Sequence, residues 1–149
     1  MMNRRKFLTM SVVTALTLPI ASWATDYRAE RPATWTAHTV DDAVKALYGD
    51  VKLIESSDIT LKMVKVSSNG AQIPLGVKTD LDVKSIAIFQ DVNPESAVAV
   101  FTVHEGMIAD YSVKFKMAKS GEVTVVAEGR DGKYYKTSQK IQTSPGCEG

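Results

Sequence analysis

The chain has 149 residues, 44% of them hydrophobic, with 18 lysines and arginines, 17 aspartates and glutamates, and a formal net charge of +1. This length allows one domain, and the hydrophobic share is ordinary for a globular protein. Because the charges nearly balance and no basic stripe or arginine cluster is present, the composition argues against a nucleic-acid-binding protein.

Residues 1–24 are predicted to be a cleaved export signal. Arg4 and Arg5 begin a basic start, the run 7–21 is mostly apolar, and small residues lie three and one positions before a cut after Ala24. The paired arginines followed by Phe-Leu match the twin-arginine signal, Arg-Arg-x-Phe-Leu, by which bacteria export folded proteins. An ordinary secretory signal that happens to contain two arginines is the alternative.

Residues 25–51 are predicted to form a polar lead-in followed by a short amphipathic helix. Thr39 is a suitable N-cap, and acidic residues follow it at the positive end of the helix. Gly49 can end the helix. Four apolar residues follow helical spacing: Val40, Ala43, Val44 and Leu47. We expect this apolar face to pack on the body of the protein.

Residues 52–143 are predicted to form a β-sandwich. Turn signals at Asn69-Gly70 and Asp131-Gly132 favour two-residue hairpins, and Pro74 is typical of an edge or bulged strand. The expected strands span residues 52–55, 59–66, 71–79, 83–90, 97–105, 111–117, 122–128 and 133–143.

The apolar pattern within these segments distinguishes inner strands from half-exposed ones. Segments 83–90 and 97–105 have apolar residues at adjacent and alternate positions, which is typical of strands covered on both faces. Segment 111–117 alternates, with Val113 and Phe115 expected to face inward. These short strands with regular turns predict an all-β fold, an antiparallel immunoglobulin-like sandwich with a short N-terminal helix and a mobile C-terminal tail.

Catalytic and metal-binding motifs are not found in the chain. The candidate copper ligands are His38, His104, Met63, Met107 and Met117, but they do not make a blue-copper set. Met63 and Met117 fall on apolar strand faces and are expected in the core. The sequence has no nucleophile elbow, phosphate loop, zinc-protease motif or paired-cysteine motif. We therefore expect a scaffold rather than an enzyme, without a metal or cofactor.

The tail, residues 144–149, contains the single cysteine of the chain. Cys147 lies between Gly146 and Glu148 with no apolar neighbour, unlike a buried structural cysteine. In an exported protein a cysteine that cannot pair within its own chain suggests an intermolecular bond or a reactive thiol. The residues from Ile141 to Cys147, if extended, would span roughly 20 Å.

Two classes of function are compatible with this tail. In one, the protein is a covalent carrier that takes its cargo on Cys147. Glu148 and the terminal carboxylate of Gly149 disfavour the thiolate, so a partner would have to activate the thiol. In the other, the protein is an exported binding or adhesion module whose cysteine is incidental.

The sequence resembles the SoxY family, the sulfur-carrier subunits of the bacterial thiosulfate-oxidising system. The resemblance rests on the segments Ile59-Thr60-Leu61-Lys62-Met63, Asn69-Gly70-Ala71-Gln72-Ile73-Pro74-Leu75, Val125-Val126-Ala127-Glu128, Asp131-Gly132-Lys133-Tyr134-Tyr135 and Gly146-Cys147. It implies a periplasmic immunoglobulin-like subunit that pairs with a second small β-protein, SoxZ. It also implies that Cys147 covalently holds sulfur derived from thiosulfate.

The resemblance further implies enzymes that act on the carried sulfur. These are the haem c-type sulfur transferase SoxAX, the manganese-dependent sulfate-releasing hydrolase SoxB and, where present, the sulfane dehydrogenase SoxCD. The carrier itself would catalyse nothing.

The ending departs from the family's usual Gly-Gly-Cys-Gly-Gly, because Pro145 and Glu148 replace two glycines. Pro145 should stiffen the tail near its root, and Glu148 places a charge beside the thiol.

Overall fold

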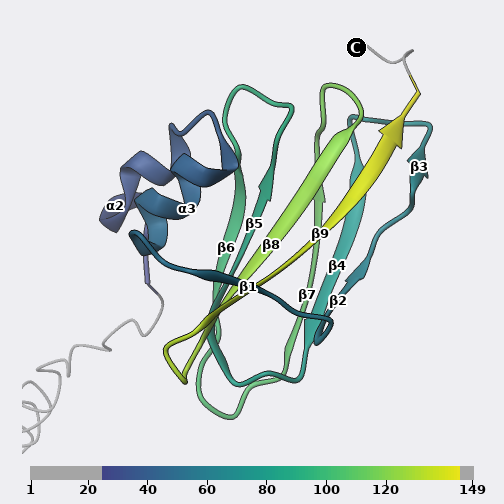
Figure 1. The fold of residues 1–149 in the computed structure, drawn as a ribbon. Coiled ribbons are helices and arrows are strands. Elements are labelled where there is room, and N and C mark those ends of the chain that lie inside the picture. The colour runs from purple at the N-terminus through teal and green to yellow at the C-terminus, as the bar shows by residue number, and fades with distance from the viewer. Residues whose placement is uncertain (1–24, 145–149) are drawn as a thin grey trace, which may run out of the picture.

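The computed structural model describes residues 25–144, which form three layers (Figure 1). A helical layer covers one face of a large β-sheet, and a small sheet covers the other face. No helix among these described residues is long and apolar enough to cross a membrane. The strands make an immunoglobulin-like β-sandwich, so the predicted fold class is confirmed.

The helical layer consists of α2 (Tyr27–Glu30), the 3-10 helix η1 (Pro32–Trp35) and α3 (Val40–Tyr48). The predicted helix is therefore confirmed. The Thr39 hydroxyl accepts a hydrogen bond from the Asp42 N–H at 3.1 Å, and Gly49 ends the helix at a φ of 84°, which suits a residue without a side chain. The polar lead-in, for which no regular structure is predicted, in fact forms the two short helical turns that precede α3.

Between residues 25 and 144 the two sheets contain nine strands. The large sheet has the order β1 (Leu53–Glu55), β9 (Tyr134–Thr143), β8 (Gly121–Gly129), β5 (Val83–Gln90) and β6 (Ala97–Thr102), and β3 (Val66–Ser67) also pairs with β9. The small sheet has the order β2 (Ile59–Lys62), β4 (Ile73–Thr79) and β7 (Ala109–Phe115). The long strands pair antiparallel, as expected, whereas β1 and β3 run parallel to β9.

The segment predicted as one strand, 59–66, is two strands in different sheets. β2 pairs with β4 in the small sheet, and β3 pairs with β9 in the large one. The chain therefore crosses between the layers at Met63–Lys65, where the Gln139 side-chain amide donates to the Met63 carbonyl at 3.0 Å. The prediction of a two-residue hairpin at Asn69-Gly70 is therefore wrong. The strands before and after this turn, β3 and β4, lie in different sheets and do not pair.

Two further local predictions need correction. β4 is the central strand of the small sheet, so the prediction that Pro74 marks an edge strand is wrong. The pairing of β2 with β4 ends opposite Gly76, and at Pro74 only β7 pairs with β4. The proline therefore lies where one side of β4 has no neighbouring strand. The β8–β9 hairpin has a three-residue loop, 130–132, because the Gly129 N–H donates to the Lys133 carbonyl at 2.8 Å. Gly132, at a φ of 82°, supplies the left-handed residue of this loop.

Two apolar clusters hold the layers together. β5 contributes to both, because Ile86 and Ile88 face the core between the sheets while Ala87 and Phe89 face α3. Strand β5 is therefore covered on both faces, as its apolar residues at adjacent and alternate positions predict. The expected inward positions of β7, Val113 and Phe115, also lie in or against the core between the sheets.

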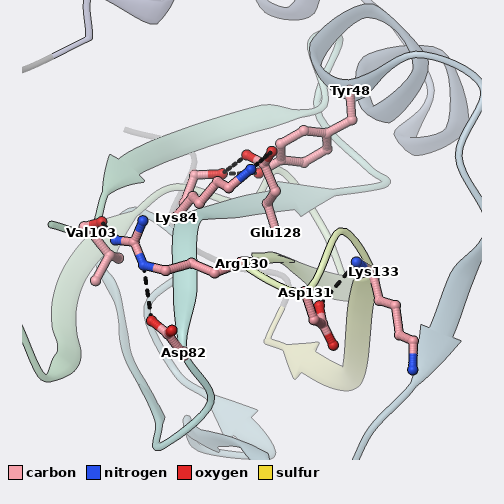
Figure 2. A network of polar contacts seen from close by, with 9 residues as sticks. Tyr48, Asp82, Lys84, Val103, Glu128, Arg130, Asp131 and Lys133 are labelled. Carbon is pink, nitrogen blue, oxygen red and sulfur yellow. Dashed lines mark hydrogen bonds and ion pairs between the residues drawn. The ribbon is translucent and has the colours of Figure 1, made fainter. Parts of the chain in front are cut away.

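A polar network connects the helical layer to the large sheet (Figure 2). The Tyr48 hydroxyl lies 2.8 Å from the Ser85 hydroxyl, which donates to the Glu128 carboxylate at 3.1 Å. At the hairpin, the Arg130 guanidinium donates to the Asp82 carboxylate at 2.9 Å and to the Val103 carbonyl at 2.8 Å. Arg130 therefore ties three loops together at the end of the sandwich opposite the end of β9.

We predict that Tyr48→Phe lowers the free energy of unfolding by about 1 kcal/mol at neutral pH, because it removes one partly buried hydrogen bond between α3 and β5. Burial raises the pKa of the Tyr48 phenol above its ordinary value of 10.0. The phenol thus stays neutral in the folded protein and ionises near pH 10 in the unfolded chain, so its contribution is lost as the pH rises above about 10. Chemical denaturation from pH 7 to pH 11 measures the free energy of unfolding of both proteins. The difference in this free energy between wild type and variant should become smaller above about pH 10.

Tyr111→Phe is the matched control, since the Tyr111 hydroxyl makes only a long hydrogen bond, 3.4 Å, to the Thr102 carbonyl. If Tyr48→Phe and Tyr111→Phe lower the free energy of unfolding equally at neutral pH, the Tyr48 hydrogen bond has no special role in stability.

Candidate functional site

The tail residues predicted to form the site lie outside the described residues. This applies to Cys147 and its neighbours Pro145, Gly146, Glu148 and Gly149, and the signal arginines Arg4 and Arg5 also lie outside them. The chain is described up to Ser144, directly after β9. The part of the site that the structure describes is therefore the tail root, which we define as residues 142–144 with the groups that contact them.

On one side, β3 holds the tail root. Gln142 lies opposite Val66 and Thr143 opposite Ser67 in a parallel pair. The Gln142 N–H donates to the Lys65 carbonyl at 2.8 Å, and the Ser144 N–H donates to the Ser67 carbonyl at 3.0 Å. Figure 1 shows β3 and the end of β9 at the same end of the sandwich.

On the other side, the loop before β8 holds the tail root through Ser120. The Ser120 hydroxyl accepts a hydrogen bond from the Thr143 N–H at 2.9 Å and lies 3.4 Å from the Thr143 carbonyl oxygen, to which it donates. The backbone is thus fixed as far as Ser144. Cys147 is the third residue after Ser144, so covalent geometry limits its distance from Ser144 to about 10 Å, rather than the 20 Å expected from Ile141.

A tight turn packs beneath the tail root. The Asn69 side-chain oxygen accepts a hydrogen bond from the Ala71 N–H at 2.9 Å, and the Gly70 carbonyl accepts one from the Met117 N–H at 2.9 Å. A Cβ added at Gly70 would lie 2.8 Å from the Met117 carbonyl oxygen and 3.8 Å from the Thr143 Cβ. Glycine is therefore required at this position because the backbone of the β7–β8 loop approaches so closely.

The surface beside the tail root combines apolar and cationic residues. Val64 and Val66 are 47% and 61% exposed, and Lys65 between them is also exposed. Lys119, next to Ser120, is exposed as well. The groups that hold the tail root are backbone amides, carbonyls and a serine hydroxyl, so this framework positions the tail but offers no general acid or base. Sequence reasoning missed these contacts; the sequence signal for them is the polar run Ser67-Ser68-Asn69-Gly70.

The other candidate residues do not converge on a second site. The His38 ring Nδ1–H donates to the Pro94 carbonyl at 2.6 Å, so this side chain joins the lead-in to the β5–β6 loop. Met117 is buried in the core and Met63 packs against it, as predicted. Between residues 25 and 144 no group of three or more histidine, cysteine, aspartate or glutamate residues could hold a metal ion.

Two comparisons connect the chain to known sulfur oxidation proteins. The family model described as sulfur oxidation protein SoxY matches residues 44–147. The sulfur carrier protein SoxY from Chlorobium limicola f thiosulfatophilum is 31% identical, with 71% of this chain and 96% of that chain covered and a TM-score of 0.66. The family match includes Cys147. No match was found among curated proteins.

Superoxide reductases share the fold only. A variant of the enzyme (neelaredoxin) from Ignicoccus hospitalis is 8% identical over 62% of this chain and 94% of that chain, with a TM-score of 0.53. A superoxide reductase homologue from Thermotoga maritima is 12% identical over 63% of this chain and 94% of that one, with a TM-score of 0.50. At such low identity these likenesses extend to the sandwich architecture and not to activity.

We predict that Ser120→Ala frees the end of β9, because it removes the side-chain acceptor of the Thr143 N–H. Amide hydrogen exchange should become at least tenfold faster at residues 142–144 and stay unchanged at the centre of β9. Ser138→Ala is the control: Ser138 also bonds through its hydroxyl, to Thr124 at 3.0 Å, but in the middle of the strand. Unchanged exchange at Thr143 in Ser120→Ala would show that β3 alone holds the tail root.

Proposed function

Because the chain belongs to the SoxY family of sulfur oxidation proteins, we propose that it carries thiosulfate-derived sulfur covalently on Cys147. The observation that carries this proposal is that the family match extends through Cys147, only three residues beyond a backbone that is hydrogen-bonded on both sides. A thiol on a short extension of a rigid body suits a group that is presented to other proteins. The role in sulfur oxidation follows from the family.

The proposed loading step is an oxidation. The Cys147 thiol and thiosulfate form a sulfur–sulfur bond, which gives a cysteine S-thiosulfonate and releases one proton and two electrons. The electrons pass to an acceptor outside this chain, for which we propose the haem c-type sulfur transferase SoxAX. Since the tail root has no acid, base or redox group among its described contacts, the partner must also deprotonate the thiol.

The proposed release step is a hydrolysis. Water attacks the terminal sulfonate, sulfate leaves with two protons, and a persulfide anion stays on Cys147. The hydrolase SoxB, with manganese, is the proposed catalyst, and SoxCD is the proposed oxidant of the remaining sulfane sulfur where it is present. In this proposal the described part of the chain positions the tail root, and the enzymes supply the catalysis.

The short reach restricts how these partners bind. With about 10 Å between Ser144 and Cys147, the end of the sandwich must come close to each enzyme's entrance. The exposed valines Val64 and Val66 beside the tail root would then lie at the contact. This supports docking of the sandwich end against the enzyme, rather than a long tether acting at a distance.

The proposed location is the periplasm, after cleavage of the signal at Ala24 and export by the twin-arginine route. The proposed permanent partner is SoxZ, in a heterodimer. Export of folded protein suits a subunit that crosses the membrane together with a partner.

We predict that Cys147→Ser abolishes thiosulfate-dependent growth and sulfate production while the protein level and thermal unfolding midpoint stay unchanged. The substitution removes the single thiol of the chain, at a position beyond the described residues. Growth on thiosulfate and sulfate release in a strain that expresses only the variant provide the measurement.

Glu148→Gly is the matched control for this prediction, since it changes the tail but keeps the thiol. It removes the anion beside Cys147, so it should support sulfate production at least equal to wild type with partners adapted to a glycine-rich tail. Normal growth of the Cys147→Ser strain would instead favour an exported binding or adhesion module with an incidental cysteine.

A further inference from the structure

Strand β6 forms an open edge of the large sheet. It pairs with β5 on one side, and no strand among residues 25–144 pairs with it on the other. The opposite edge of the same sheet is different, because both β1 and β3 lie against β9 there. One edge of the large sheet is thus made of two short strands, which is a common way to protect an edge, and the other is the longer strand β6.

The backbone of β6 presents hydrogen-bonding groups along this open edge. The Val103 N–H donates to the Lys84 carbonyl at 2.8 Å, which shows that Val103 faces β5. In an antiparallel pair the direction alternates from residue to residue. The N–H and C=O groups of Thr102 and Val100 therefore point away from β5, toward the open side. The Thr102 carbonyl accepts only a long bond, 3.4 Å, from the Tyr111 hydroxyl.

The side chains of β6 do not protect this edge. Proteins commonly block open edges with charged residues or prolines, because an open edge pairs readily with another strand. The outer strands of the small sheet follow that rule, with Lys62 on β2 and with Asp110 and Lys114 on β7. Strand β6, with the sequence Ala-Val-Ala-Val-Phe-Thr, carries neither charge nor proline.

The side chains of β6 already pack within the subunit. Ala99 and Phe101 pack against the core between the sheets, Val100 packs against the α3 cluster, and the Phe101 ring stacks on Tyr111 at 4.5 Å between centroids. Their remaining exposure is intermediate. The open groups of β6 are therefore chiefly backbone groups, which fit an extended strand rather than a small molecule.

We propose that β6 is the docking edge for the permanent partner subunit, which adds an uncharged β-strand to the large sheet. This inference rests on the proposed function, in which the chain works as a heterodimer with SoxZ. Strand addition satisfies the outward backbone groups of Val100 and Thr102, and an uncharged mate avoids burying an unpaired charge against β6.

The position of β6 suits a carrier. Strands β5 and β8 separate it from β9, so three strand spacings place it about 14 Å from the strand that ends at the tail root. A partner added at β6 widens the sheet on the side away from β3 and leaves the tail root uncovered. The chain can thus keep its partner bound while an enzyme receives Cys147.

The test compares two threonine-to-lysine substitutions on outer strands. Thr102→Lys places a charge on β6, whereas Thr60→Lys places the same charge on β2, the strand of the small sheet farthest from β7. Binding of each mature protein to purified SoxZ is measured by calorimetry and by mass in solution. We expect Thr102→Lys to weaken binding at least tenfold and Thr60→Lys to change it less than twofold.

A second variant keeps the test valid if Thr102→Lys proves unstable. Val100→Pro removes an outward N–H at an edge position, where proline is tolerated, and should weaken SoxZ binding by a similar factor. Thermal unfolding checks that each variant is folded. Normal SoxZ binding by folded Thr102→Lys and Val100→Pro would overturn the assignment of β6. The assignment would also be overturned if β6 paired only with β6 of a second copy of this chain.

Failure of this inference and failure of the proposed function give different results. If wild type does not bind SoxZ, both the docking edge and the heterodimer are wrong, yet sulfate production through Cys147 can still be observed. If wild type binds SoxZ but the β6 variants bind equally well, the heterodimer stands and only its docking edge is wrong.

Discussion

Hydrogen bonds on both sides of β9 fix the end of this strand, and with it the start of the tail. β3 bonds the backbone of β9 as far as Ser144, and Ser120 bonds Thr143 from the opposite side. A fixed root limits the distance of Cys147 from Ser144 to about 10 Å, the length of three extended residues. The Gly70 turn beneath the root belongs to the same arrangement, since even one added carbon there would meet the backbone at Met117.

The two edges of the large sheet divide the work of the molecule. One edge consists of the short parallel strands β1 and β3 and lies beside the tail root, while the other is the uncharged strand β6, which we propose as the docking edge. The polar network around Arg130 fixes the loops at the far end, and α3 covers the outer face of the sheet. At the tail root the described residues supply backbone hydrogen bonds and one serine hydroxyl, which fix its position.

Sequence patterns predicted the helices and strands that are determined by residues close together in the chain. Strand β5 begins and ends at the predicted residues, and α3 begins after its predicted cap, because apolar runs and caps act within a few positions. The split of 59–66 between two sheets could not be predicted, since it depends on the distant partners Gln139 and Gln142. The prediction from Pro74 failed for a related reason. The proline lies where β4 has a neighbour on one side only, but this depends on where β2 ends and does not make β4 an edge strand. For the site, the sequence singled out Cys147, but the shortness of its reach followed only from the β3–β9 pairing.

The most direct test of the account is mass spectrometry of the intact protein and its C-terminal peptide, isolated without reductant from cells that are oxidising thiosulfate. If Cys147 is the carrier thiol, its peptide will show added mass that corresponds to a thiosulfonate or to sulfane sulfur. A thiol reductant will remove this mass, and it will be absent when thiosulfate is withheld. A bare thiol, or only a symmetrical disulfide dimer, during active thiosulfate oxidation would contradict the carrier function while leaving the sandwich and its tail root as described.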